Sequence, residues 1–262
     1  MKIGIIGGGA MGGTLARRLF EISCTADAKR EEFQITVTNP HIDKLNDLKE
    51  QGAYVSTSNF AVLEGADLVV IAVKPWKVKE VIEEIAPFLE KNTEVSLIVA
   101  GISGEDLINM FGEYTPSNLS VAMPNTAMQT GKSMTFIVPL KGNPALADQV
   151  FQQVGKVKVI EEKFLPAATA LASCGIAYAL RYVRAATEGG VELGFKAEDA
   201  QEIVARTIEG AVSLLKPGVH AEAEIDKVTT PGGLTIKGLN AMEKFGFSTA
   251  VIEGLKTINQ KR

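Results

Sequence analysis

Short apolar runs alternate with amphipathic stretches along residues 1–162 of the chain. The run at 68–73 is almost wholly aliphatic, which is typical of a strand buried on both faces of a parallel sheet. Residues 78–89 instead carry their apolar side chains at helical spacing. The expected strands are 3–6, 34–38, 68–73, 95–100, 119–123, 135–138 and 157–160, and the expected helices are 11–22, 42–50 and 78–89. This alternation predicts the α/β fold class, with a mostly parallel, doubly wound sheet.

The pattern changes after about residue 164, beyond which helical spacing dominates and β-rich runs disappear. Residues 166–194 are rich in alanine and are expected to form one or two buried helices. Three more helices are expected at 196–215, 234–245 and 248–258. No Ser- or Pro-rich linker separates the two parts, so we expect them to pack tightly. We predict an α/β domain over 1–162 and an all-helical domain over 163–262.

The composition argues against several classes of protein. A net charge of −4 gives no electrostatic reason to bind nucleic acid or an anionic membrane. No uninterrupted apolar stretch approaches the roughly 18 residues that span a bilayer, and glycines break the apolar run near the N-terminus, against a signal peptide. The two cysteines, Cys24 and Cys174, lie far apart and fit a reducing compartment better than a disulfide framework. We therefore expect a cytoplasmic protein with no nucleic-acid or membrane partner.

The strongest local pattern is Gly-Gly-Gly-Ala-Met-Gly at residues 7–12, between an expected strand and an expected helix. In this G-x-G-x-x-G arrangement Gly7 permits a tight turn, Gly9 lets the backbone approach a pyrophosphate, and Gly12 allows close helix–strand packing. The free N–H groups at the helix N-terminus favour the phosphates electrostatically. The alternative is a glycine-rich turn without a ligand. The residues assigned to cofactor binding here are Gly7, Gly9, Ala10, Met11 and Gly12.

The end of the second expected strand bears on the choice between NAD and NADP. An NAD-preferring site usually carries Asp or Glu at this position to bind the ribose hydroxyls, whereas this chain has Asn39. Without a carboxylate there is less repulsion of a 2′-phosphate, and His41 or Lys44 could supply positive charge. The alternative is that both side chains are simply solvated at the start of a helix. The pattern favours NADP, with NAD possible.

Two further loops follow buried strands, at the carboxyl edge where ligands bind in parallel sheets. Residues 72–75, Ala-Val-Lys-Pro, follow the aliphatic strand, and the lysine can face the cofactor. Residues 99–101, Val-Ala-Gly, end the next strand with small residues that leave room for a flat nicotinamide ring. Ordinary turns at the ends of strands are the alternative interpretation. We assign Val73, Lys74, Pro75 and Ala100 to the cofactor site.

The most distinctive stretch of the second half is Thr-Thr-Pro-Gly-Gly at residues 229–233, which opens directly onto a helical pattern. Consecutive free N–H groups at the start of such a helix form an anion-binding site of a size that fits a carboxylate. Thr235 lies just inside the helix and carries a hydroxyl that can donate a hydrogen bond. The alternative is a plain turn followed by a helix cap.

Taken together, these segments resemble the pyrroline-5-carboxylate reductase family over essentially the whole chain. The specific element is Val-Thr-Thr-Pro-Gly-Gly-Leu-Thr-Ile at residues 228–236, because many dehydrogenases share the glycine pattern. The matching segments are 3–12, Asn59, 72–75, 123–126, 170–178 and 228–239. Their order and spacing support the resemblance.

The resemblance implies an enzyme, an NAD(P)-dependent oxidoreductase that acts on a CH–NH bond. In this family a hydride passes from NAD(P)H to 1-pyrroline-5-carboxylate, a small-molecule substrate, and gives L-proline in the last step of proline biosynthesis. The family also implies an N-terminal Rossmann domain and a C-terminal helical domain that interleaves with a second subunit. We thus expect a homodimer, or a higher homo-oligomer built from dimers, with the active site between the cofactor and the helical domain.

The resemblance also assigns roles to individual residues. Asn59 matches a position that contacts the adenosine ribose, and Val73, Lys74 and Ala100 match positions beside the nicotinamide half. The residues that match the loop holding the substrate carboxylate and ring nitrogen are Thr230, Gly233, Leu234 and Thr235. Thr235 is the expected catalytic residue, through a hydrogen bond to the ring nitrogen. A cyclic iminium can arrive already protonated, so a strong acid need not be supplied, and no metal site is assigned.

The chain departs from the family pattern at residues 172–176. The family usually reads Ser-Gly-Ser-Gly-Pro there, whereas this chain reads Ala-Ser-Cys-Gly-Ile. These changes lie in the substrate region and bear on substrate range and turnover. Cys174 has no base at a recognisable spacing, so a small packed thiol is a better interpretation than a nucleophile.

Two other functions stay open on the sequence alone. Another imine or hydroxyacid dehydrogenase could share the two-domain plan, but the hydroxyacid enzymes generally place a catalytic lysine on a long helix of the second domain. Residues 177–193 contain Arg181 and Arg184 and no lysine. A non-catalytic nucleotide-binding regulator is favoured only by the altered segment at 172–176.

Overall fold

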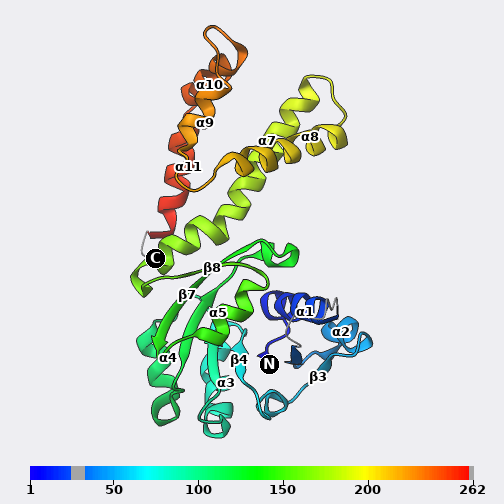
Figure 1. Ribbon diagram of the computed structural model, residues 1–262, viewed down its shortest axis with the longest axis vertical. Helices are drawn as coiled ribbons and strands as arrows, with labels where there is room; N and C mark the ends of the chain where they lie inside the picture. The colour runs from blue at the N-terminus through cyan, green and yellow to red at the C-terminus, as the bar shows by residue number, and fades with distance from the viewer. Residues whose placement is uncertain (25–32, 260–262) are drawn as a thin grey trace. The chain divides into compact units, whose positions relative to one another are not determined.

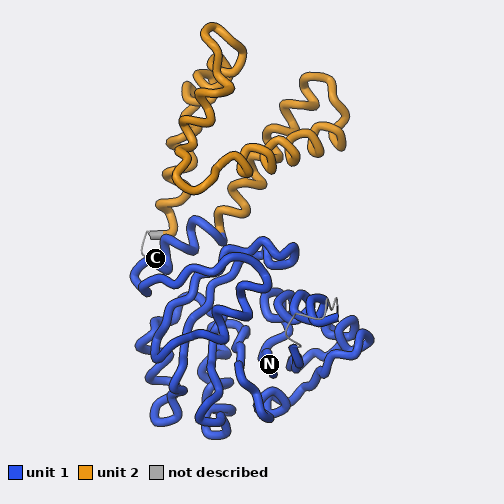
Figure 2. Tube along the Cα trace, in the orientation of Figure 1, with its two compact units in different colours: residues 1–173 blue, residues 174–262 orange. Residues whose placement is uncertain are grey.

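The computed structural model describes residues 1–24 and 33–259, and the chain forms two compact units. The first unit covers residues 1–173 and the second covers residues 174–262 (Figure 2). Strands and helices alternate through most of the first unit, while the described part of the second contains helices and no strand (Figure 1). The fold class expected from the apolar pattern is confirmed.

The first unit is built on one eight-stranded sheet with the order β3-β2-β1-β4-β5-β6-β7-β8. All neighbouring strands are parallel except β6 and β7. The strands are β1 (Lys2–Ile6), β2 (Gln34–Thr38), β3 (Tyr54–Ser56), β4 (Leu68–Ile71), β5 (Glu94–Leu97), β6 (Leu119–Met123), β7 (Ser133–Lys141) and β8 (Gly155–Val159). In the register of β1, Ile5 lies opposite Val37 on one side and Val70 on the other. The strand order reverses at β1, so a ligand crevice is expected beyond its carboxyl end.

Helices cover both faces of this sheet, and each face has its own apolar core. The strand β4 shows the division, because Leu68 and Val70 belong to one core while Val69 and Ile71 belong to the other. The helices of this unit are α1 (Ala10–Cys24), α2 (Asn46–Glu50), α3 (Pro75–Ile85), α4 (Gly104–Phe111), α5 (Ala145–Gln152) and α6 (Leu165–Ala168). The first core takes side chains of α1, α2 and α5, and the second takes those of α3 and α4. Burying one such aliphatic side chain stabilises the fold by about 1.5–3 kcal/mol. A strand that is aliphatic throughout, such as β4, therefore helps to hold the helices on both faces of the sheet.

The apolar pattern does not reveal four short elements: β3, α4, α5 and α9 (Ala221–Lys227). Such elements depend on local caps more than on periodicity, as in α4, where the Ser103 side chain accepts a hydrogen bond from the N–H of Asp106. The helix expected at 42–50 is divided into a 3-10 turn, Ile42–Leu45, and α2. The strand expected at 95–100 ends at Leu97.

The second unit consists of helices that bury little of their surface in the single chain. Besides α9 they are α7 (Gly175–Glu192), α8 (Ala197–Leu214), α10 (Leu234–Lys244) and α11 (Phe247–Lys256). Between residues 175 and 258, only Thr187 and Ala200 are buried. The expectation of buried helices is therefore wrong for α7, because α8 covers only part of its surface. Large exposed apolar side chains include Leu180, Tyr182, Val191, Leu193, Ile203, Val212 and Phe245.

Residues 163–173 belong to the first unit, although the sequence pattern groups them with the helical half. They lie in a 3-10 turn (Glu162–Phe164), in α6 (Leu165–Ala168) and in a π-helix, η7 (Thr169–Cys174). Leu165 packs against the core formed with α3 and α4, a contact that sequence periodicity does not show. The domain boundary predicted at residue 162 marks a change of pattern, and it stays a prediction.

Among the described residues, one helical run, Glu162–Glu192, is long and apolar enough to cross a membrane by length and composition. Only 11 % of its most apolar window is buried in the single chain. The expected absence of a membrane partner therefore stays a prediction.

Candidate functional site

A cavity of about 770 Å³ lies in the first unit, at the carboxyl ends of the central strands. Its lining includes Ile6 of β1, Thr38 of β2, and residues directly after β4, β5 and β6. The volume is in the range of small-molecule and cofactor sites. Ten of the eleven residues predicted to bind the cofactor line it: Gly7, Gly9, Ala10, Met11, Asn39, Asn59, Val73, Lys74, Pro75 and Ala100. Gly12 is the exception.

The glycine turn uses each glycine for a different reason. Gly7 has a φ of 100°, and the N–H groups of Gly7 and Gly8 both donate to the carbonyl oxygen of Thr38 at 2.9 Å. A Cβ atom on Gly12 would lie 2.2 Å from the carbonyl oxygen of Gly7, so Gly12 sets the close packing of α1. A Cβ atom on Gly9 would meet no protein atom within 4 Å. Gly9 therefore leaves open space in the cavity lining that suits a phosphate group.

Some of the charges around the cavity suit an anionic ligand, although Glu80 and Glu84 also line it. The helix α1 has no acidic residue in its first turn, so none of its own carboxylates competes for the N–H groups at its N-terminus. Lys74 is exposed and has no ion pair with any residue that the structure describes. Lys77 also lines the cavity, where its ammonium lies 2.6 Å from Glu80. With the open space at Gly9, these features fit a dinucleotide.

The predicted preference for NADP depends on Asn39, whose side chain is committed to its own loop. Asn39 is buried, and its Oδ1 accepts a hydrogen bond from the backbone N–H of His41 at 2.9 Å. His41 lines the cavity, whereas Lys44 is not part of the described lining. Lys44 contacts another element through its backbone, since its carbonyl oxygen accepts a hydrogen bond from Nη2 of Arg17 at 2.9 Å. Of the two side chains suggested as partners of a 2′-phosphate, the structure places His41 at the cavity.

Asn59 lies in this cavity between a threonine and a glutamate. The hydroxyl of Thr38 donates to its Oδ1 at 2.8 Å, and its Nδ2 donates to Oε2 of Glu84 at 2.8 Å. Sequence reasoning missed the cavity residues of α3, which are Lys77, Glu80, Val81 and Glu84. Their spacing of three and four positions, just after a predicted cofactor loop, is the signal that could have placed them on the cavity side.

The loop after β6 and the π-helix form another part of the lining. Asn125 donates from Nδ2 to the carbonyl oxygen of Ala172 at 3.1 Å and accepts from the N–H of Ala127 at 3.0 Å. Ser173 follows in the π-helix and lines the cavity, with a hydroxyl that has no partner among the described residues. The altered segment at 172–176 therefore contributes a hydroxyl group to the cavity, a contact that sequence reasoning did not assign.

The predicted substrate residues lie together in the second unit, in the loop between α9 and α10 and in the first turn of α10. Gly232 has a φ of 70°, and the N–H of Gly233 donates to the carbonyl oxygen of Thr230 at 3.0 Å. No side chain caps α10, so the N–H groups of its first turn remain available. Leu234 and Thr235 are exposed, and the Thr235 hydroxyl has no partner within the described part of the chain. This loop can bind an anion, while the roles of its residues toward a substrate stay predictions.

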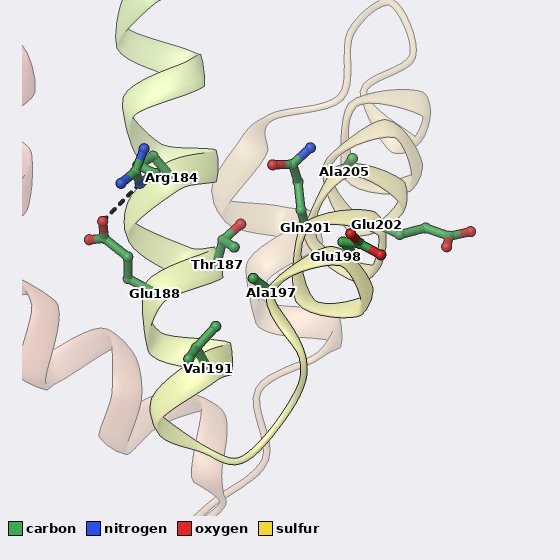
Figure 3. A pocket seen from close by; sticks show the side chains of 9 residues that line it. All are labelled: Arg184, Thr187, Glu188, Val191, Ala197, Glu198, Gln201, Glu202 and Ala205. Carbon is green, nitrogen blue, oxygen red and sulfur yellow. Dashed lines mark hydrogen bonds and ion pairs between the residues drawn. The ribbon is translucent and has the colours of Figure 1, made fainter.

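A second hollow, of about 620 Å³, lies between α7 and α8 in the second unit (Figure 3). Thr187, Val191, Ala197 and Gln201 lie along the space between these helices. Arg184 forms an ion pair with Glu188 of its own helix at 2.8 Å. No residue predicted to bind cofactor or substrate lines this hollow, so it belongs to the surface that the second unit leaves uncovered.

Two family models match the chain and together cover most of it. A model described as pyrroline-5-carboxylate reductase dimerisation matches residues 162–262, and one described as NADP oxidoreductase coenzyme F420-dependent matches residues 2–101. Pyrroline-5-carboxylate reductase 1 of Dictyostelium discoideum is 36 % identical over 99 % of this chain, and pyrroline-5-carboxylate reductase 2 of that organism is 37 % identical over 97 %. The chain spans 49 % of the first relative and 89 % of the second.

Solved structures show the same likeness. The crystal structure of Plasmodium falciparum pyrroline carboxylate reductase with NADP bound matches with a TM-score of 0.83 and 26 % identity, over 98 % of this chain and 95 % of that chain. A pyrroline-5-carboxylate reductase from Coxiella burnetii matches with a TM-score of 0.83 and 27 % identity over the same shares.

Proposed function

Because the chain belongs to the pyrroline-5-carboxylate reductase family, we propose that it reduces 1-pyrroline-5-carboxylate to L-proline with NADPH, in proline biosynthesis. The observation that carries the proposal is the single cavity that gathers the glycine turn with the loops after β4 and β5. The NADP bound in the Plasmodium relative supports the choice of cofactor. Only the altered segment at 172–176 favours a regulator, and residues 177–193 lack the lysine expected of a hydroxyacid dehydrogenase.

A reduced nicotinamide, when bound, supplies the hydride that reduces the imine carbon. The chain itself has to bind and orient the reactants. The glycine turn and the N-terminus of α1 would hold the pyrophosphate, Asn59 the adenosine ribose, and Val73 with Ala100 the nicotinamide half. The N–H groups after Gly233 would bind the substrate carboxylate, while the hydroxyl of Thr235 would hydrogen-bond the ring nitrogen and fix its orientation.

We also propose that a second copy of the chain covers the second unit. This unit carries the dimerisation match and buries only Thr187 and Ala200 among its described residues. Exposed apolar area of this extent favours association, and a partner helix packed on α7 would account for its apolar surface without a membrane. The two free cysteines support a location in the cytoplasm, where thiols stay reduced.

Steady-state oxidation of NADPH in the presence of 1-pyrroline-5-carboxylate tests the activity, with NADH measured in parallel. We expect proline as the product and a lower KM for NADPH than for NADH. A protein that binds NADPH but oxidises none of it with this imine would contradict the proposal and favour a nucleotide-binding regulator.

Thr235→Ala tests the assignment of the second-unit loop. The exposed hydroxyl has no partner among the described residues, so its loss should leave the fold intact. We expect kcat/KM for the imine to fall by about 10- to 100-fold, because a donor that orients the substrate is lost. Thr207→Ala on α8 is the control, since that hydroxyl donates to the carbonyl oxygen of Ile203 within its own helix. Unchanged kinetics in Thr235→Ala would remove the role of Thr235.

A further inference from the structure

Three side chains from separate elements form one hydrogen-bonded row in the wall of the cavity. Thr38 ends β2, Asn59 begins the 3-10 turn Asn59–Val62, and Glu84 lies in the last turn of α3. The Thr38 hydroxyl donates to Oδ1 of Asn59 at 2.8 Å, and Nδ2 of Asn59 donates to Oε2 of Glu84, also at 2.8 Å. All three residues line the cavity.

The glutamate decides which way the amide faces. A threonine hydroxyl can donate or accept, so Thr38 alone would tolerate either orientation of the Asn59 amide. An ionised carboxylate only accepts, so the amide nitrogen must face Glu84 and the amide oxygen must face Thr38. One amide hydrogen and one oxygen lone pair of Asn59 then remain for a ligand in the cavity.

Glu84 is distinct from the other acidic residues of its helix. Glu80 pairs with Lys77 at 2.6 Å, and Glu83 pairs with Lys79 at 3.7 Å. Glu84 has no lysine or arginine partner in the described part of the chain, and its carboxylate accepts the hydrogen bond from Asn59. The side chains of α3 that hold the core are Val78, Val81, Ile82 and Ile85. Glu84 is therefore not needed for the packing of α3.

We propose that Glu84 is a positioning residue for the cofactor: it holds the Asn59 amide in the one orientation that binds the adenosine half of NADPH. The end of β2, where Thr38 lies, is the place where sheets of this kind bind the adenosine ribose. Glu84 acts through Asn59 and takes no part in the chemistry. The inference rests on the proposed use of NADPH and is independent of the imine that is reduced.

Binding to the free protein provides the test. Glu84→Gln keeps the shape of the side chain, but its amide can donate as well as accept, which frees Asn59 to turn over. The titration uses NADPH and 2′,5′-ADP, with the fluorescence of the nucleotide and of Trp76 as readouts for NADPH. Trp76 is the only tryptophan in the chain, and its neighbours Pro75 and Lys77 line the cavity.

We expect the Kd of both ligands to rise about three- to tenfold, as for the loss of one well-oriented hydrogen bond. The unfolding temperature should stay the same, and kcat at saturating NADPH should change less than twofold. Glu83→Gln removes the same charge from the adjacent, solvent-exposed position and should leave both Kd values unchanged. Glu84→Met, an apolar side chain of the same length, repeats the test if Glu84→Gln does not fold.

The double variant separates positioning from a direct contact. If Glu84 acts only through Asn59, then Glu84→Gln should weaken binding no further once Asn59→Ala is present. Multiplying effects, or a Kd of wild-type value in Glu84→Gln, would overturn the proposal. If the protein binds NADPH but does not reduce the imine, the proposed function is refuted, while the binding test of Glu84 stays valid.

Discussion

Asn125 donates a hydrogen bond from Nδ2 to the carbonyl oxygen of Ala172 at 3.1 Å, and so joins the loop after β6 to the π-helix. Asn125 is only 6 % exposed, so water cannot easily replace this bond. Ser173, the next residue after Ala172, lines the cavity. One buried amide therefore helps to set the position of a cavity hydroxyl that lies in a different element.

Replacing Asn125 with Asp should loosen the π-helix. The carboxylate still accepts from Ala127, but it cannot donate to Ala172 and brings a negative charge beside that carbonyl oxygen. We expect a loss of about 1–3 kcal/mol in the free energy of unfolding, and faster amide hydrogen exchange at 169–174. Exchange in α5 serves as the internal reference. Equal protection of 169–174 in both proteins would show that other contacts hold this helix.

Two glycine substitutions should separate binding from stability. Gly9→Ala adds a methyl group where no protein atom lies within 4 Å, so the fold should be unaffected while NADPH binds at least tenfold more weakly. Gly12→Ala forces a methyl group against the carbonyl oxygen of Gly7 and should cost about 1–3 kcal/mol or more in stability. Urea unfolding and NADPH titration of both variants check this contrast. Equal losses of stability would refute it.

Glu94 should make the stability of the first unit depend on pH. Its buried carboxylate accepts the N–H groups of Ala147 and Leu146 at 2.7 and 3.1 Å, at the start of α5. Burial raises the pKa of the Glu94 carboxyl above its ordinary value, although these two backbone N–H groups oppose the shift.

The sign of the effect follows from this direction. The folded protein holds the Glu94 proton more tightly than the unfolded chain does. The resulting contribution to the free energy of unfolding is therefore fully present at a pH below the ordinary pKa of the carboxyl. It is lost as the pH rises through the higher pKa of the folded state. The side chain in Glu94→Gln cannot titrate. The stability of the wild type relative to this variant should therefore fall as the pH rises from the ordinary pKa of a glutamate to the higher pKa of Glu94 in the folded protein. Parallel pH profiles from urea unfolding would contradict the assignment.

The oligomeric state should depend on the apolar surface of α7. Leu180 and Val191 are 61 % and 45 % exposed in the single chain, so the double change to Glu should prevent a second copy from packing there. We expect a smaller species by size-exclusion chromatography with light scattering, and a lower unfolding temperature. Tyr54→Glu, at an exposed apolar position of the first unit, is the control. An unchanged mass together with binding to lipid vesicles would indicate that a membrane covers this surface.

The sequence predicted those parts of the site that depend on neighbours in the chain. The expected strands 34–38 and 119–123 coincide with β2 and β6, because their apolar runs are bounded by clear breaks. The glycine turn follows from three glycines at fixed spacing between a strand and a helix, and Gly7 has the positive φ that such a turn requires.

Other parts of the site depend on contacts between distant segments, which periodicity does not report. Glu84 meets Asn59 across 25 positions, and Asn125 meets Ala172 across 47. Both contacts depend on how α3 and the π-helix pack within the first unit. The exposure of α7 differs from the expectation for another reason: its alanine-rich sequence predicts burial, whereas α8 covers only part of its surface in the single chain.

The near absence of burial in the second unit has a consequence for the life of the chain in the cell. If another copy covers this unit, its stability would rise with the concentration of the protein. Dilution alone would then destabilise it. A newly made chain would then have to meet another before its second unit is stably folded. Until that encounter, its apolar helices would be open to chaperones and proteases.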